Sequence, residues 1–197
     1  MKNVLKRMLV LVFAFTTITS IASSRSASIK VLKVKDNLIN LKLMNLNESV
    51  AIALKDNDGI TLYKEKVVNS YFSKKIDLRN LKDGSYIIEL ENFNRIKEVS
   101  FSIVSGKVIL EDAKEVVKYK PIVNLKGNSV YISKLCLNYE TLEITMYDSD
   151  GNNLYNEMLS GKRNLGIKLN IEQLEVGKYD IVMKSGDKIF YKTIRKI

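Results

Sequence analysis

The sequence predicts an all-β protein: two tandem immunoglobulin-like antiparallel β-sandwich modules after an N-terminal signal peptide. Three observations lead to this prediction. The chain begins with an apolar leader, the remainder repeats itself at an offset of about 92 residues, and each repeat alternates apolar and polar residues with the period of a β-strand. The 197 residues leave room for two modules of about 85 residues each after the leader.

The first 24 residues carry the parts of a secretory signal peptide in the usual order. Three basic residues come first, residues 8–22 are mostly apolar, and small residues follow up to Ser24. We therefore predict a signal peptide over 1–24, cleavage after Ser24 and an exported mature chain. The alternative is a membrane anchor, which needs about 20 apolar residues and so a longer stretch than this one.

The remainder of the chain is an internal repeat. Over the repeat the offset drifts only from 91 to 93, which is hard to obtain by chance, so we treat the two halves as copies of one module. The predicted domains are a signal peptide over 1–24, a β-sandwich module over 29–113 and a second β-sandwich module over 118–197. The residues that return in the second half are Asp56, Asp58, Gly59, Leu81, Gly84 and Tyr86, matched by Asp148, Asp150, Gly151, Leu174, Gly177 and Tyr179.

In chain order, the first clear strand of each module precedes its Asp-Gly pair. Apolar residues at every second position predict one buried face for this strand. Further strands are predicted over 86–90, 95–104 and 107–110 in the first module and over 179–183 and 189–194 in the second. The alternating apolar residues of the first strand are Val50, Ile52 and Leu54 in one copy and Leu142, Ile144 and Met146 in the other.

The Asp-Gly pairs predict tight hairpin turns. Asp58-Gly59 and Asp150-Gly151 each follow a strand, and both residues of such a pair tolerate the positive φ that hairpin turns require. A calcium loop is the alternative, because acidic residues recur at spacings that partly fit an EF-hand. Its first ligand position would be an apolar residue in both copies, so we expect no EF-hand and leave open only a weak, open calcium site.

A tyrosine follows a glycine turn at the start of a late strand in both copies. Tyr86 and Tyr179 stand in the pattern Leu-x-x-Gly-x-Tyr. In immunoglobulin-like sandwiches a tyrosine in this place forms a tyrosine corner, with its hydroxyl bonded to upstream backbone. We predict this structural role for both residues; the alternative is a tyrosine that binds a ligand.

The composition argues against catalysis. The chain contains no His and one Cys, which removes Ser-His-Asp triads, Cys-His pairs and imidazole-ligated zinc sites. Glu89, Glu91, Glu157 and Glu172 could supply the two carboxylates of a glycosidase, but nothing in the sequence places two of them across a cleft. We therefore predict no enzyme, no catalytic residue, no metal site and no cofactor.

The charge and the lone cysteine point to an ordinary soluble surface. The formal net charge is +10, and it falls to +7 when the three basic residues of the leader are removed. These charges form no dense basic stripe, so we expect no nucleic-acid partner. Cys136 lies between two leucines and is predicted to be a small buried hydrophobe, with pairing to another chain as the alternative.

Residues 76–86 and 169–179 carry a further resemblance. Both stretches resemble the C-terminal sorting domain of type IX secretion cargo, a small β-sandwich, and the whole mature chain looks like secreted Bacteroidota proteins built from two such modules. The resemblance implies a β-sandwich fold and no catalytic residues. Sorting domains follow a large cargo domain, whereas this chain has only a second copy of the module.

These observations predict an exported, non-enzymatic structural or interaction protein in the periplasm, at the cell surface or outside the cell. We expect it to bind an unidentified protein or glycan of the cell envelope through sheet edges or loops such as 56–60 and 148–153. Two alternatives stay open. The second module could be a sorting signal, or aromatic residues could form a carbohydrate-binding face, with candidates Tyr63, Tyr71, Phe72, Tyr147 and Tyr155.

Overall fold

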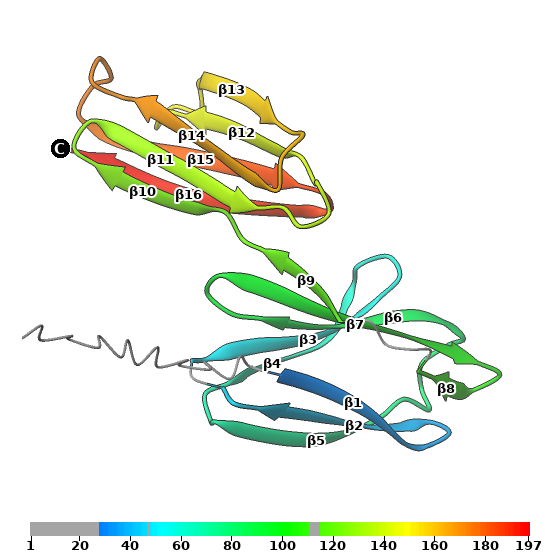
Figure 1. Ribbon diagram of the computed structural model, residues 1–197. Helices are drawn as coiled ribbons and strands as arrows, with labels where there is room; N and C mark the ends of the chain where they lie inside the picture. The colour runs from blue at the N-terminus through cyan, green and yellow to red at the C-terminus, as the bar shows by residue number, and fades with distance from the viewer. Residues whose placement is uncertain (1–27, 47, 111–114) are drawn as a thin grey trace, which may run out of the picture.

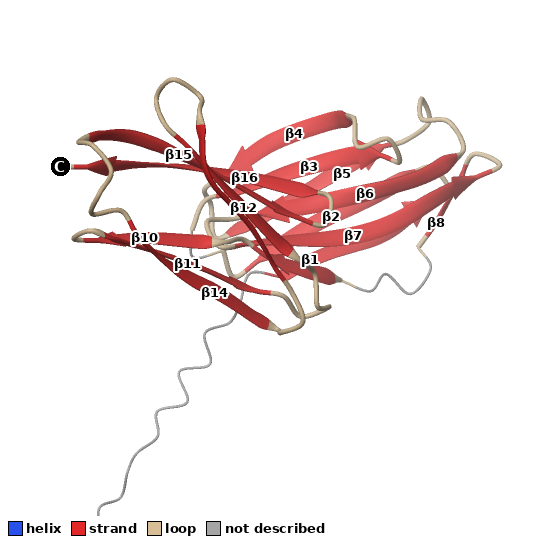
Figure 2. Cartoon of the chain, turned by 90° about the horizontal axis from the view of Figure 1, so that it is seen from above, coloured by secondary structure: helices blue, strands red, loops and turns tan. Residues whose placement is uncertain are grey.

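The computed structural model describes residues 28–46, 48–110 and 115–197, and all its regular elements are β-strands (Figures 1 and 2). The predicted signal peptide, its cleavage site and the predicted end of the first domain at residue 113 lie outside these residues. Within the described residues, no helix has the length and apolar character needed to cross a membrane. The all-β prediction is confirmed.

Eight strands form the first sandwich, and a ninth, β9, leads from it toward the second sandwich. A three-stranded sheet has the order β1-β2-β5, and the facing sheet has the order β4-β3-β6-β7-β8, with β9 paired to β7. The pairs within both sheets are antiparallel. The strands are β1 (Ser28–Lys35), β2 (Leu38–Met44), β3 (Val50–Asp56), β4 (Thr61–Val67), β5 (Tyr71–Asp77), β6 (Gly84–Glu91), β7 (Arg95–Val104), β8 (Lys107–Ile109) and β9 (Val116–Tyr119).

The second sandwich repeats this arrangement. A three-stranded sheet has the order β10-β11-β14, and a four-stranded sheet has the order β13-β12-β15-β16. Three strands facing four, all antiparallel, is an immunoglobulin-like division of strands between two sheets. The strands are β10 (Ile122–Lys126), β11 (Ser129–Leu135), β12 (Leu142–Tyr147), β13 (Asn153–Leu159), β14 (Asn164–Asn170), β15 (Gly177–Ser185) and β16 (Lys188–Lys196).

The passage between the sandwiches belongs structurally to the first one. Strand β9 pairs with the beginning of β7, so that Tyr119 lies opposite Arg95 and Lys118 opposite Ile96. The sequence places the start of the second domain at residue 118, whereas the structure keeps residues 116–119 on the first sheet. Pro121 follows after Lys120, and its fixed φ stiffens the entry to β10.

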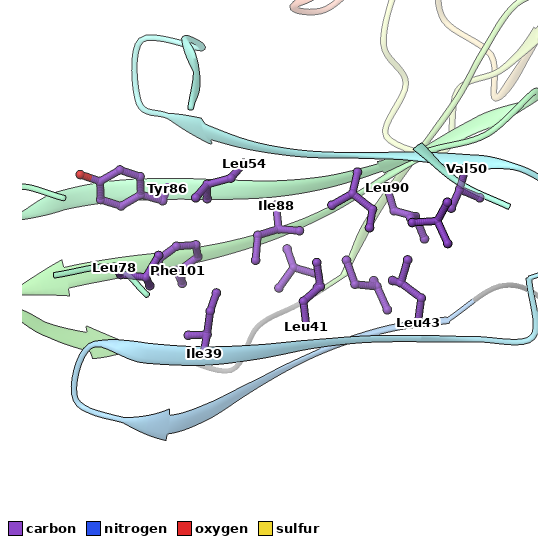
Figure 3. Packing of buried hydrophobic residues seen from close by; sticks show 14 of the residues in the cluster. Ile39, Leu41, Leu43, Val50, Leu54, Leu78, Tyr86, Ile88, Leu90 and Phe101 are labelled. Carbon is purple, nitrogen blue, oxygen red and sulfur yellow. The ribbon is translucent and has the colours of Figure 1, made fainter. Parts of the chain in front are cut away.

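Each sandwich has its own core because one face of each sheet is apolar. In β2, Ile39, Leu41 and Leu43 alternate with more exposed residues and are fully buried. Figure 3 shows how they pack against Ile88 and other residues of the facing sheet. The alternation predicted for β3 and β12 is confirmed, since its apolar residues lie in the two cores. Those of β3 are Val50, Ile52 and Leu54, and those of β12 are Leu142, Ile144 and Met146.

The hairpin β3–β4 shows how the Asp-Gly turns are built. The backbone N–H of Gly59 donates to the carbonyl of Asp56 at 3.1 Å, and Gly59 has a φ of 79°. The described non-glycine residues with positive φ do not include Asp58, so the expectation of a positive φ at both residues of the pair is corrected to the glycine alone. This is a type I turn followed by a glycine bulge, in which only one residue needs the left-handed region.

Asp56, not Asp58, closes the turn with its side chain. Its Oδ1 accepts hydrogen bonds from the backbone N–H of Asp58 at 3.1 Å and of Ile60 at 2.8 Å. The second copy repeats the arrangement with Asp148, and Gly151 has a φ of 82°. The first aspartate therefore organises the loop as an Asx turn.

Candidate functional site at the junction of the sandwiches

The site begins with two glutamates that face away from the first core. Glu89 in β6 and Glu98 in β7 lie directly opposite each other in the sheet, yet only 6% and 7% of their surfaces are exposed. The cover comes from the second sandwich, because Lys188, at the start of β16, contacts both carboxylates. The turn between β15 and β16 is thus seated on the outer face of the first sandwich.

Lysines compensate the two buried carboxylates. Lys55 in β3 binds Glu89 at 2.6 Å, and Lys118 in β9 binds Glu98 at 2.9 Å. Lys188 lies between the two glutamates, hydrogen-bonded to Glu89 and 3.2 Å from Glu98. Two like charges directly opposite each other in a sheet repel, so each glutamate needs its own partner and the shared lysine.

Asp187 completes the contact from the side of the second sandwich. Its carboxylate lies 2.9 Å from Lys118 and 3.5 Å from Lys188. The six charged groups, which we name the junction cluster, join strands of both sandwiches. The junction cluster consists of Lys55, Glu89, Glu98, Lys118, Asp187 and Lys188.

Four groups of the junction cluster have pKa shifts that favour their charged form. Burial alone raises the pKa of Glu89, but hydrogen bonds from Lys188 and Lys55 outweigh it and bring the pKa below its ordinary value. Burial lowers the pKa of Lys188, and its contact with Glu89 reverses the direction, so that the net pKa is raised. In the same way, the pKa of Lys118 is raised and that of Asp187 is lowered by their mutual hydrogen bond.

A hollow of about 550 Å³ lies beside the junction cluster, between the two sandwiches. Phe93, 82% exposed, comes from the β6–β7 turn, and Tyr191, 75% exposed, comes from β16. Lys120 and Lys192 also line the hollow, and Lys120 is held by Glu91 at 2.6 Å. Exposed aromatic rings next to cations are the side chains that proteins use to bind partners.

The tyrosines singled out in the sequence lie away from this hollow. The hydroxyl of Tyr86 donates to the carbonyl of Lys82 at 2.7 Å, and that of Tyr179 to the carbonyl of Glu175 at 2.7 Å. This bond to backbone four residues upstream is the defining contact of a tyrosine corner. Both residues are buried members of their cores.

The five aromatic residues proposed for a sugar-binding face do not form one surface. Tyr63, Phe72 and Tyr155 pack against the cores, and Tyr71 is exposed at the start of β5. Tyr147 lines a separate hollow beside Asp148. Tyr63 and Tyr155 each donate a hydrogen bond to a glutamate two residues further along the same strand. Burial, followed by the hydrogen bond to Glu157, raises the pKa of Tyr155 to about 12.

The other predicted residues have simple surroundings. Asp58, Gly59, Asp150 and Gly151 form the exposed tips of two hairpins, and within the described residues no three acidic, cysteine or histidine side chains group as metal ligands would. Cys136 is fully buried, as predicted, with Lys134 Nζ 3.5 Å from its Sγ.

Sequence reasoning missed the junction cluster. A glutamate on the outward face of a strand usually faces solvent, whereas Glu89 is buried. A signal was present, because the acidic residues Glu89, Glu91 and Glu98 fall on the outward positions of two neighbouring strands, while the second copy has no such group. Their buried state depends on the docked second sandwich, which the strand pattern alone does not reveal.

Comparison with known families gives a match for part of the first sandwich. Residues 35–105, within the first sandwich, match the family described as "Secretion system C-terminal sorting domain". The resemblance predicted from the sequence is thereby confirmed for this stretch. The second sandwich lies outside the matched residues. No curated protein matches this chain.

Several solved structures match most of this chain at low sequence identity. The BSP domain of a biofilm associated protein is 16% identical over 86% of this chain, with a TM-score of 0.30, and this chain spans 29% of its length. A two-domain fibronectin type III segment from chicken tenascin is 10% identical over 86% of this chain and 98% of its own, with a TM-score of 0.29. Chicken CNTN1 FN1-FN3 domains are 12% identical over 85% of this chain and 62% of theirs, with a TM-score of 0.27.

The sorting-domain match and the two sandwiches are consistent with a non-enzymatic exported protein. Glu89 and Glu98, the two glutamates that lie opposite each other in the sheet, are both engaged by lysines.

Proposed function

We propose that this chain is an exported interaction protein of the cell envelope, in which two sandwiches docked by the junction cluster present a binding hollow between them. The observation that carries the export is the match of residues 35–105 to a sorting domain of a secretion system. The exposed Phe93 and Tyr191 in the hollow support the binding role.

Docking gives this proposal its mechanism. A hollow between two domains binds a partner strongly only when the two domains hold a fixed relative position. If the domains were flexible, part of the binding free energy would be spent on ordering them. The junction cluster supplies that order next to the hollow. The partner itself would be a protein or glycan that offers apolar and anionic groups to aromatic rings and lysines.

Intact mass spectrometry of the native protein tests the export. Periplasm and culture medium are analysed separately, and we expect one chain that begins near residue 25 and ends at residue 197. A chain with its leader retained in the cytoplasm would contradict export. A shortened chain in the medium, ending near residue 115, would support the second candidate, in which the second sandwich is a removable sorting signal.

Crosslinking on intact exporting cells tests the hollow. The double variant Phe93→Ala/Tyr191→Ala should lose the crosslinked partners of the wild type, whereas Tyr71→Ala, which removes another exposed ring outside the hollow, should keep them. Equal crosslinking of all three proteins would contradict binding in the hollow.

A further inference from the structure

The edge strand β13 of the second sandwich differs from its counterpart β4 in the first sandwich. β13 is the terminal strand of its sheet and, among the described residues, pairs only with β12. Tyr155 and Leu159 of β13 pack toward the core, so Leu154, Asn156 and Met158 point outward. Leu154 is 40% exposed and Met158 is 62% exposed. An exposed edge without charges on its outward face is a place where another strand can pair.

In the first copy, the residues at the equivalent positions of β4 disfavour pairing with another strand. At an offset of 92 residues, β4 has Leu62, Lys64 and Lys66, so two lysines replace Asn156 and Met158. Lysine on an edge strand is a common device against edge-to-edge pairing. The β4 edge is also tied to β5, because Lys74 binds Glu65 at 2.8 Å, and the residue at the matching place in β14 is Ile167.

β13 is complementary to itself in an antiparallel register. A twofold axis through Asn156 would place Leu154 opposite Met158 of the partner subunit, and Tyr155 opposite Glu157 of the partner subunit. Both exposed apolar side chains then gain a neighbour, and the two Asn156 amides face each other. The same register in β4 would set Lys64 opposite Lys64 of the partner subunit, which is unfavourable.

The charges at the two ends of β13 favour the antiparallel direction. Asp148 and Asp150 precede the strand, whereas Lys162 and Arg163 follow it. An antiparallel pair brings the acidic end of one copy to the basic end of the other, and a parallel pair would bring like charges together. Asp150 and Lys162 are both exposed.

We propose that β13 is a self-association site, through which a second copy of this chain pairs antiparallel about Asn156 and extends the β13-β12-β15-β16 sheet across the dimer. The interface is isologous, so it closes at two chains. This proposal does not depend on export or on the hollow, since β13 contributes no residue to the lining of that hollow.

Disulfide trapping tests the register. In an antiparallel pair, directly opposite Cα atoms lie about 4.5–5.5 Å apart, within reach of a disulfide. With oxidised glutathione as the oxidant, the full chain carrying Asn156→Cys should form a disulfide-linked dimer. Lys64→Cys, the matched position of the first copy, should not, and the wild type controls for Cys136. Equal trapping at both positions, or none at Asn156→Cys, would overturn the proposal.

Sedimentation velocity over a wide concentration range provides the second measurement. The wild type should show reversible dimers. The variant Asn156→Lys/Met158→Lys, which gives β13 the lysines of β4, should weaken dimerisation at least about tenfold while its melting temperature stays the same. The reverse variant, Lys64→Asn/Lys66→Met, should gain self-association at β4. A wild type that stays monomeric throughout, or a lysine variant that dimerises equally well, would overturn the proposal.

Discussion

At the scale of single residues, aspartates shape the loops at one end of each sandwich. Asp148 uses both carboxylate oxygens, since Oδ1 accepts from the backbone N–H groups of Asp150 and Asn152, and Oδ2 accepts from the Asn152 side chain at 2.8 Å. These bonds, led by those from Asn152, lower the pKa of Asp148. A carboxylate engaged in this way holds a turn and has little capacity left for a cation.

Gly151→Ala should destabilise the second sandwich by about 1 kcal/mol, because a φ of 82° is unfavourable for any residue with a Cβ. Apart from the adjoining residues of the chain, no heavy atom lies within 4 Å of the added methyl group, so the cost is one of backbone conformation. Gly177→Ala is the matched control, since its site is equally open and lacks the positive φ. Urea unfolding checks both variants; equal losses of unfolding free energy would contradict the assignment.

Tyr179→Phe should lower the unfolding free energy by about 1 kcal/mol, because the Glu175 carbonyl loses its donor. Tyr131→Phe, which removes an exposed hydroxyl from β11, should have no measurable effect. Chemical denaturation of the two variants makes the comparison. A stable Tyr179→Phe protein with altered partner binding would instead assign this tyrosine to a ligand site.

At the scale of strands, corresponding elements of the two copies perform different tasks. The β15–β16 turn of the second copy is seated on the first sandwich through Asp187 and Lys188. The corresponding β6–β7 turn of the first copy holds Phe93 in the open hollow. Its Asn92 accepts hydrogen bonds from the backbone N–H of Asn94 and Arg95, so the turn is ordered without a docking partner.

Lys188→Met should release the second sandwich from the first, because in the docked state Glu89 and Glu98 would lie buried beside each other without the cation they share. Small-angle X-ray scattering should show a larger radius of gyration. Lys184→Met, an exposed lysine of β15 without an ion pair among the described residues, should leave the radius unchanged. A compact Lys188→Met protein would contradict docking by the junction cluster.

The strand pattern shows which parts of this fold are readable from a sequence. Alternation located β3 and β12, and the Leu-x-x-Gly-x-Tyr pattern located the start of β6 and β15. These features are local, because they depend on one strand and its turn. The burial of Glu89 is not local, since it needs a hairpin that arrives about 100 residues later, and no periodicity within β6 reports it.

At the scale of the whole molecule, charge links the relative placement of the sandwiches to pH. Glu89 and Asp187 have lowered pKa values, so their contribution to docking is complete above the ordinary carboxylate values of 4.5 and 3.8 and disappears as the pH falls through the lowered values. Lys118 and Lys188 have raised pKa values, so their contribution is complete below 10.5 and disappears as the pH rises through the raised values.

We therefore expect a compact, docked protein from about pH 5 to about pH 10 and an increase in the radius of gyration outside this window. Scattering measured across the pH range checks this expectation. High salt at neutral pH should have a smaller effect, because Glu89 and Glu98 are buried and poorly screened. A radius that stays constant down to pH 2 would show that the junction holds without its charges.

The contact between the two sandwiches joins the tip of one copy to the flank of the other, so it is heterologous. Identical modules joined in this way would stack without end into a filament. Here the counterparts of the two flank glutamates are Val182 and Tyr191, which again lie opposite each other but carry no charge to receive a lysine. The second copy therefore lacks the receiving flank, and the stack is finite.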